Sequence, residues 1–146
     1  SLCDWSSDVC SSDLVDALNG APGVHSARYA ASDPERIERL LAELAAANDR
    51  RSAAGMPAQR SARFSAALAL ADPSGTIRLE VEGHCPGVIL EAPRGQGGFG
   101  YDPVFLVPEL NLSFAEMDKA TKARVGHRGR AFALLEPRLR ALLGEV

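Results

Sequence analysis

One stretch of alternating side chains, between residues 63 and 83, constrains the fold more than any other part of the chain. Residues 63–70 are mostly apolar, and residues 72–75 (DPSG) supply the residue types of a tight turn. Over residues 76–83 apolar and charged side chains alternate, with the period of two that is typical of a half-buried strand. The stretch predicts an antiparallel β-hairpin, and the apolar run at residues 88–90 predicts a third strand.

Ser32 marks the start of a predicted amphipathic helix. Ser32 and Glu35 have the spacing of a capping box, in which each side chain accepts from the other residue's backbone amide. Apolar residues then recur at the spacing of one helical face: Ile37, Leu40, Leu41 and Leu44. We predict a helix that ends near Ala47, followed by a polar, mobile connector over residues 48–61.

The last part of the chain predicts two more helices. Ser113 and Glu116 form a second capping box, which opens a short helix toward Lys122. A final helix starts after a loop at Gly126 and is kinked or interrupted at Pro137, because proline lacks an amide donor. The order of elements predicts an α/β domain, with a mixed sheet that contains an antiparallel hairpin and has flanking helices, rather than alternating βαβ units.

The composition and charge of the chain disfavour several classes of binding partner. The net charge of −3 and the pI near 5.6 disfavour nucleic acid and polybasic membrane-surface binding. No apolar run approaches the roughly 18 residues of a membrane span, and the first residues lack the pattern of a signal peptide. The three cysteines form no CxxC pair. We expect a cytoplasmic protein that acts on a small molecule, with no nucleic-acid or membrane partner.

The first residues differ from the rest of the chain. Residues 1–13 hold two of the three cysteines and the only tryptophan, show no helical or strand period, and predict no element. The run SLCDWSSDVCSSDL resembles translated sequencing-adapter text. We expect residues 1–14 to be foreign or disordered, and residues 15–146 to be the C-terminal part of a single domain.

A glycine-rich run, RGQGGFGYDP at residues 94–103, is the densest chemical signal. Gly95, Gly97 and Gly100 satisfy GxGxxG, but no helix is predicted directly after them, so the dinucleotide-binding interpretation fails. Two interpretations stay open: a plain glycine turn, or a loop whose backbone approaches a ligand. In the second case Phe99 and Tyr101 offer aromatic faces to a purine and Asp102 offers an acceptor.

A cationic run, KATKARVGHRGR at residues 119–130, is the second signal. A solvated helix face explains most such runs. The alternative is an anion clamp, with Lys122 near a helix end and a tight, flexible turn at residues 126–129 that projects His127 and Arg128. The segment at residues 26–29 (SARY) is a weaker site, His25 and His84 lack metal-ligand spacing, and Cys85 is interpreted as a buried apolar residue.

Several motifs in one order resemble the inosine triphosphate pyrophosphatase family, also called XTP/dITP diphosphatases. They are VDAL from Val15, GAPG from Gly20, SARY from Ser26, GGFGYDPVF from Gly97, FAEM from Phe114, Lys122, and HRG from His127. The resemblance extends from Val15 to the C-terminus. It implies an ITPase-like (Maf/Ham1-like) architecture that is incomplete at the N-terminus.

The resemblance also implies a reaction and a set of site residues. Family members cleave ITP, dITP and XTP between the α and β phosphates with Mg²⁺, giving the monophosphate and pyrophosphate, and are typically homodimers. Phe99, Gly100, Tyr101 and Asp102 would form the substrate loop, with Phe99 against the purine. Lys122, His127 and Arg128 would complete the substrate contacts. His127 and Arg128 would select a 6-keto purine, whose oxygen accepts where the amino group of adenine donates.

The chain departs from the family pattern at its start. The Thr/Ser-x-Asn-x-x-Lys phosphate loop, an upstream metal-binding glutamate and an Asp-Asp-Ser-Gly-Leu segment are not found. In register, Cys10 stands where the family has its catalytic aspartate, and Ser11 coincides with a family serine by chance. We therefore assign no catalytic residue and no metal ligand, and we expect the catalytic activity of this chain to be impaired. The alternative function is a non-catalytic fragment that binds purine nucleotides.

Overall fold

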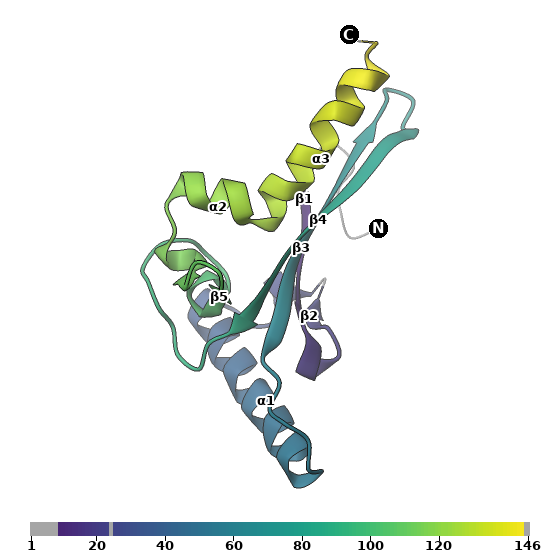
Figure 1. Cartoon of the computed structure of the whole chain (residues 1–146). Helices are drawn as coiled ribbons and strands as arrows, with labels where there is room; N and C mark the ends of the chain where they lie inside the picture. The colour runs from purple at the N-terminus through teal and green to yellow at the C-terminus, as the bar shows by residue number, and fades with distance from the viewer. Residues whose placement is uncertain (1–8, 24, 145–146) are drawn as a thin grey trace. The chain divides into compact units, whose positions relative to one another are not determined.

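The computed structural model describes residues 9–23 and 25–144, which form strands and helices in an α/β arrangement (Figure 1). The strands are β1 (Val9–Val15), β2 (Ala21–Gly23), β3 (Ser61–Ala71), β4 (Ile77–Ile89), β5 (Phe105–Val107) and β6 (Leu112–Ser113). The α-helices are α1 (Asp33–Ala53), α2 (Lys119–Val125) and α3 (His127–Leu142). The strands form one sheet in the order β2-β1-β3-β4-β5-β6. The predicted α/β fold class is confirmed.

The described residues group into two compact units. The first contains residues 9–11, Phe64–Cys85 and residues 119–144, and so holds the start of β1 and most of the β3–β4 hairpin with α2 and α3. The second contains Ser12–Arg63 and Pro86–Asp118, and so holds β2, α1, β5 and β6. Each unit is described by itself. The division into residues 1–14 and a single domain over 15–146 stays a prediction.

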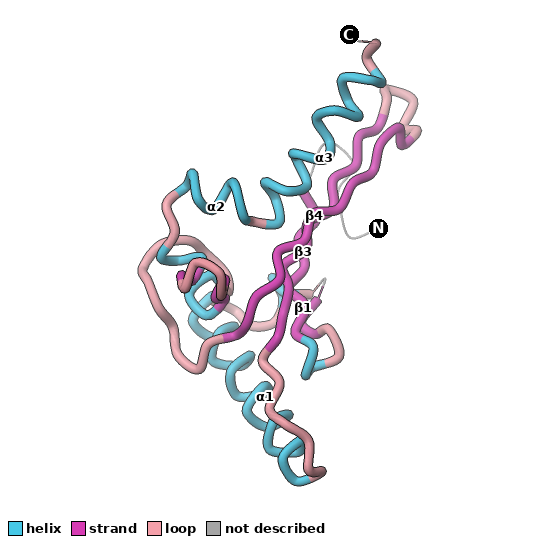
Figure 2. Tube along the Cα trace, viewed as in Figure 1, coloured by secondary structure: helices cyan, strands magenta, loops and turns pink. Residues whose placement is uncertain are grey.

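The predicted hairpin is confirmed, and both of its strands are longer than predicted (Figure 2). The prediction of a separate third strand at residues 88–90 is wrong, because β4 runs without a break to Ile89. Pro86 does not end the strand, since its fixed φ is compatible with an extended backbone. At the end of β4, Val88 and Ile89 pair antiparallel with Leu106 and Phe105 of β5.

Helix α1 begins where the capping signal predicts. The Ser32 hydroxyl accepts from the Glu35 amide at 3.4 Å, and the buried face of the helix consists of Ile37, Leu40, Leu44 and Ala47. The predicted end at Ala47 is wrong by six residues, because the polar residues 48–53 continue the helix. Apolar periodicity marks only the buried part of a helix, so it cannot show how far an exposed last turn extends.

Two predicted helices near the C-terminus also differ from the observed ones in where they begin or end. The Ser113–Glu116 capping box is present, but it opens only the 3₁₀ turn Phe114–Glu116, and α2 begins separately at Lys119. Helix α3 continues through Pro137 to Leu142, so the predicted interruption is not found. Because it is not interrupted, helix α3 is long enough to lie along the β3–β4 hairpin.

Residues 9–13 lie in a strand, so the prediction that they form no element is wrong. Asp13, Leu14 and Val15 of β1 pair antiparallel with Gly23, Pro22 and Ala21 of β2. The partner strand supplies this order, which no local period in the sequence indicates. The rest of that segment, residues 1–8, lies outside the described residues. Among the described helices, none combines the length and apolar character needed to cross a bilayer.

In the first unit, α3 packs on the hairpin through a small, tightly filled core (Figure 1). Its buried members are Ala66, Leu68, Val81 and Ala131, with Leu135 against them. A Cβ atom on Gly83 of β4 would lie 2.3 Å from the backbone nitrogen of Ala131 and from the backbone oxygen of His127. Only glycine allows this approach of helix and strand.

We therefore expect Gly83→Ala to lower the free energy of unfolding by about 1–3 kcal/mol, because the added methyl group forces α3 and β4 apart. The measurement is urea unfolding at pH 7. Glu80→Ala on the exposed side of the same strand is the control and should change stability by less than about 0.5 kcal/mol. Equal stability of Gly83→Ala and the unmodified chain would contradict this account of the packing.

Candidate functional site

The glycine-rich loop lies in the second unit, between β4 and β5, and folds around Asp102. Gly95, Gly98 and Gly100 have positive φ angles, which glycine adopts without strain. The Asp102 carboxylate accepts from the Phe99 amide at 3.1 Å, and a Cβ atom on Gly98 would lie 2.2 Å from that carboxylate. Asp102 is only 5% exposed. The carboxylate of Asp102 thus shapes the loop from inside.

The base of the loop is fixed to the 3₁₀ turn at Phe114–Glu116. The Gly97 amide donates to the Ala115 carbonyl at 3.1 Å, and the Ser113 hydroxyl donates to the Arg94 carbonyl at 2.6 Å. The Arg94 guanidinium is 3.1 Å from the Glu116 carboxylate. In these contacts the second capping box serves as a support for the loop.

The two aromatic residues of the loop have different surroundings. The Phe99 side chain is 57% exposed, although phenylalanine is apolar. Tyr101 is 3% exposed, and its hydroxyl donates to the Ser26 carbonyl at 2.8 Å. Burial, followed by the charge of Asp13, raises the pKa of the Tyr101 hydroxyl. The buried Tyr101 ring anchors the loop and has no open face for a purine, contrary to the prediction, whereas the role of the exposed Phe99 ring stays a prediction.

Sequence reasoning missed two residues that hold this loop. Ser26 accepts from Tyr101, 75 positions away, and Asp33 accepts from the Gly100 amide, 67 positions away. The only local signals were the SARY motif, set aside as weak, and the capping box, where Asp33 had no assigned role. Contacts between residues so far apart in sequence leave no periodic trace in it.

The cationic residues lie in the first unit, on two successive helices. Lys122 lies in α2, whereas His127 and Arg128 begin α3, with Gly126 as the N-cap. The predicted tight, flexible turn at residues 126–129 is therefore wrong. A Cβ atom on Gly129 would lie 1.6 Å from the Ala123 carbonyl oxygen, so this glycine allows α2 and α3 to cross closely.

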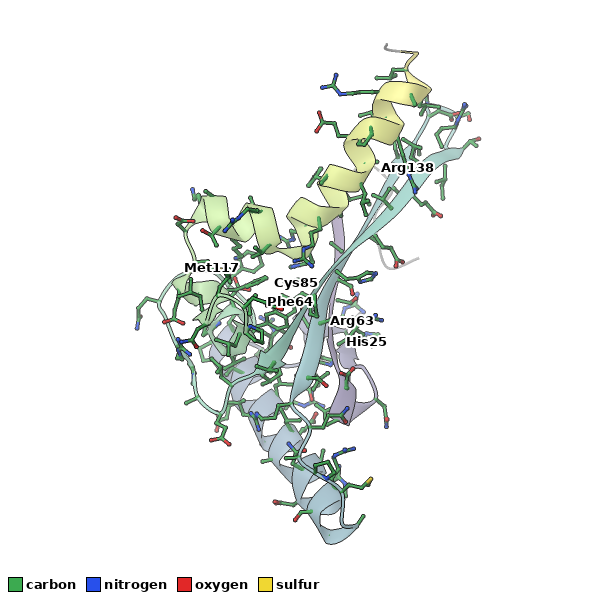
Figure 3. All side chains as sticks on the ribbon, in the orientation of Figure 1. His25, Arg63, Phe64, Cys85, Met117 and Arg138 are labelled. Atoms are coloured by element: carbon green, nitrogen blue, oxygen red, sulfur yellow. The ribbon has the colours of Figure 1, made fainter. Side chains whose placement is uncertain are left out.

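His127 is buried and close to two cations. Its ring meets that of Phe64 (labelled in Figure 3) edge to face, with 5.2 Å between the centroids. Burial lowers the pKa of His127 to about 4, with further contributions from Arg128 and Lys122. The imidazole is therefore neutral at pH 7 and carries one N–H donor rather than two. Arg128 and Lys122 supply the positive charge of this cluster.

The predicted substrate residues thus fall into two sets. Phe99, Gly100, Tyr101 and Asp102 belong to the second unit, and Lys122, His127 and Arg128 belong to the first. Within residues 9–23 and 25–144, no three histidine, cysteine, aspartate or glutamate side chains group as a metal site. The expected Mg²⁺ cofactor stays a prediction.

The structure also describes the surroundings of three residues to which the sequence analysis gave no site role, Cys85, His84 and His25. Cys85 is only 1% exposed, which confirms its interpretation as a buried residue. The His84 ring lies 2.8 Å from the Ser65 hydroxyl on the neighbouring strand and 3.5 Å from the Glu82 carboxylate. His25 is exposed.

The chain is similar to known proteins over most of its length. The family model described as Ham1 family matches residues 11–138. A dITP/XTP pyrophosphatase of Parasynechococcus marenigrum is 55% identical over 129 residues, which cover 88% of this chain and 61% of that protein. A dITP/XTP pyrophosphatase of a Synechococcus species is 58% identical over 129 residues, covering 88% and 58%.

Solved structures agree with these sequence matches. A HAM1 protein from Coxiella burnetii has a TM-score of 0.82 and 37% identity, with 92% of this chain and 66% of that chain covered. The Staphylococcus aureus Ham1 protein has a TM-score of 0.78 and 35% identity, with 91% and 65% covered. The chain spans about three fifths of the length of the curated relatives it matches.

The burial of His127 makes the stability of the chain pH-dependent. Its folded pKa of about 4 lies below the usual 6.5, so the unfolded chain binds more protons between these pH values. The contribution of the neutral His127 to the free energy of unfolding is therefore fully present above pH 6.5. It decreases as the pH drops toward 4, by up to about 3 kcal/mol. Urea unfolding at several pH values measures this loss.

His127→Gln should remove this part of the pH dependence, since glutamine does not titrate. His25→Gln, at an exposed histidine, is the control and should leave the dependence as it is. An unchanged pH profile in His127→Gln would show that His127 is not buried as described.

Proposed function

The chain belongs to the Ham1 family, and we propose on that basis that it acts on non-standard purine nucleoside triphosphates such as dITP, XTP and ITP. The proposed reaction is hydrolysis between the α and β phosphates, which gives the monophosphate and pyrophosphate. Curated relatives at 54–58% identity carry the name dITP/XTP pyrophosphatase, which supports this substrate class. The expected role is the removal of such nucleotides from the nucleotide pool.

The observation that carries the proposal is the exposed Phe99 on a loop whose backbone is held on both sides. An exposed apolar ring is unfavourable in water, and a purine base provides the flat partner that would cover it. Stacking on an aromatic side chain contributes about 1–3 kcal/mol per base. A ring on a fixed backbone binds with little loss of conformational entropy, so its position favours a base-binding role.

The surroundings of His127 and Arg128 support selection of a 6-keto purine. Arg128 offers guanidinium N–H donors, and the neutral His127 offers one N–H. The keto oxygen of hypoxanthine or xanthine accepts from such donors. The 6-amino group of adenine is itself a donor and would leave them unpaired, which costs binding energy. Discrimination by donors therefore does not require a charged histidine.

Lys122 is the proposed partner of the phosphates. A triphosphate carries several negative charges, and a lysine stabilises them by charge-assisted hydrogen bonds. No catalytic base is assigned within the described residues.

Three further expectations accompany the family. We propose Mg²⁺ as the cofactor that neutralises the phosphates, a cytoplasmic location and a homodimer, all by resemblance. The described residues do not group into a metal site, so no catalytic step is derived through the metal. Mg²⁺ dependence is tested by measuring turnover with added Mg²⁺ and with EDTA.

The direct test of the function is pyrophosphate release from dITP, XTP and dATP in the presence of Mg²⁺, by the chain extended at its start with the phosphate loop and the Asp-Asp-Ser-Gly-Leu segment of the family. The proposal expects release from dITP and XTP and at least tenfold less from dATP. Equal turnover of dITP and dATP would contradict the proposed selectivity. Binding of dITP without release would instead favour the alternative, a non-catalytic purine-nucleotide-binding fragment.

Phe99→Ala should weaken dITP binding about tenfold or more, because the purine loses its stacking partner. The matched control is Phe132→Ala, which removes a phenylalanine of similar exposure, 54% against 57%, from α3. Calorimetric titration with dITP measures both dissociation constants. A similar effect of the two substitutions would show that Phe99 has no specific role in binding.

A further inference from the structure

Asp33, in the first turn of α1, contacts the glycine-rich loop directly. The Gly100 amide donates to one carboxylate oxygen of Asp33 at 2.9 Å. Gly100 has a φ of +59°, and nothing lies within 4 Å of the position that its Cβ would occupy. No side chain packs against the loop at this position. The hydrogen bond to Asp33 holds the backbone of Gly100 instead.

The Asp33 carboxylate is itself held in orientation. Its second oxygen accepts from the guanidinium of Arg36, one turn along the helix, and the two groups form an ion pair. The side chain of Arg36 is 20% exposed, against 42% for Asp33. The hydrogen bond from Gly100 is the largest influence on Asp33 and lowers the pKa of its carboxyl group. Asp33 is therefore a charged acceptor at neutral pH, which makes its hydrogen bond stronger than one between neutral groups.

A second anchor lies next to the first. The buried Tyr101 hydroxyl donates to the Ser26 carbonyl. The Ser26 hydroxyl in turn donates to the Gly23 carbonyl at 2.5 Å and accepts from the Asp13 amide at 3.1 Å. The side chain of Tyr101 is thus fixed to the region of β1 and β2.

Phe99 directly precedes these two anchors. Its own amide is bound by Asp102, and the next two residues are bound by Asp33 and Ser26. A segment with glycines at positions 97, 98 and 100 has many backbone conformations unless its polar groups are bound. The anchors remove this freedom on both sides of the exposed ring.

We propose that Asp33 is a positioning residue, which holds the Gly100 amide and thereby keeps Phe99 oriented for a purine base. The role in ligand binding rests on the proposed function, whereas the role in ordering the loop does not. The general stabilising effect of an acidic residue at a helix N-terminus is a separate contribution. Glu35 makes the same contribution, since it lies in the same first turn of the helix. It is exposed and is not among the residues described above that hold the loop, so it is a suitable control.

The test compares Asp33→Ala, Asp33→Asn and the control Glu35→Ala in the full chain. Amide hydrogen exchange at Gly100, followed by NMR, measures the order of the loop without any ligand. Asp33→Ala should raise the exchange rate at Gly100 at least tenfold. Asp33→Asn should largely restore protection, because its side-chain carbonyl can still accept. Glu35→Ala should leave the Gly100 rate within about twofold of the unmodified chain, although it also loses a helix N-terminal charge.

The second measurement is calorimetric titration of the same variants with IMP. Asp33→Ala should weaken IMP binding about tenfold, and Asp33→Asn and Glu35→Ala should bind within about threefold of the unmodified chain. Unchanged Gly100 exchange in Asp33→Ala would overturn the positioning role. Faster exchange with unchanged IMP affinity would overturn its link to Phe99. If the unmodified chain binds no IMP while the exchange results hold, the proposed function fails and the ordering of the loop by Asp33 stands.

Discussion

The two long strands β3 and β4 are the constraint on which the rest of the structure depends, because both compact units draw on them. Residues Phe64–Cys85 supply the sheet surface on which α3 packs. The ends of the same strands belong to the second unit, where β4 pairs with β5 and leads into the glycine-rich loop. A change in the pairing of these strands would therefore disturb the supports of both sets of candidate site residues.

Each unit uses close backbone contacts at glycine to bring its elements together. Gly83 and Gly129 allow α3 to approach β4 and α2, and Gly98 allows the loop to fold around Asp102. Where a backbone is brought so close to a neighbour, the adjacent side chains take fixed positions.

The sequence predicted the features that repeat locally. The hairpin followed from a period of two, and the start of α1 from a serine cap and a period of 3.6. The end of α1 and the continuation of β4 through Pro86 were missed, because neither is marked by a change of period. The strand at Val9–Val15 was missed because its order comes from pairing with β2. The glycine-rich and cationic runs and the family resemblance led to the seven predicted substrate residues, whereas the roles of Asp33 and Ser26 required the folded structure.

The predicted substrate residues include an exposed aromatic ring in the second unit, and a neutral imidazole and two cations in the first. The ring provides stacking energy without base selectivity, since every base has an aromatic face. Selectivity must then come from hydrogen-bond donors, and charge from Lys122 and Arg128. The lowered pKa of His127 assigns it the role of a neutral donor rather than a third cation. In the proposed function, each group would contribute a different part of the recognition of a 6-keto purine nucleotide.

The measurement that tests this account most directly is NMR titration of the isotope-labelled chain with IMP and, in parallel, with AMP. The account predicts that IMP shifts the amide signals of Phe99–Asp102 and of Lys122, His127 and Arg128, and that AMP at the same concentration shifts them much less. Equal shifts with IMP and AMP, or shifts confined to other residues, would contradict it.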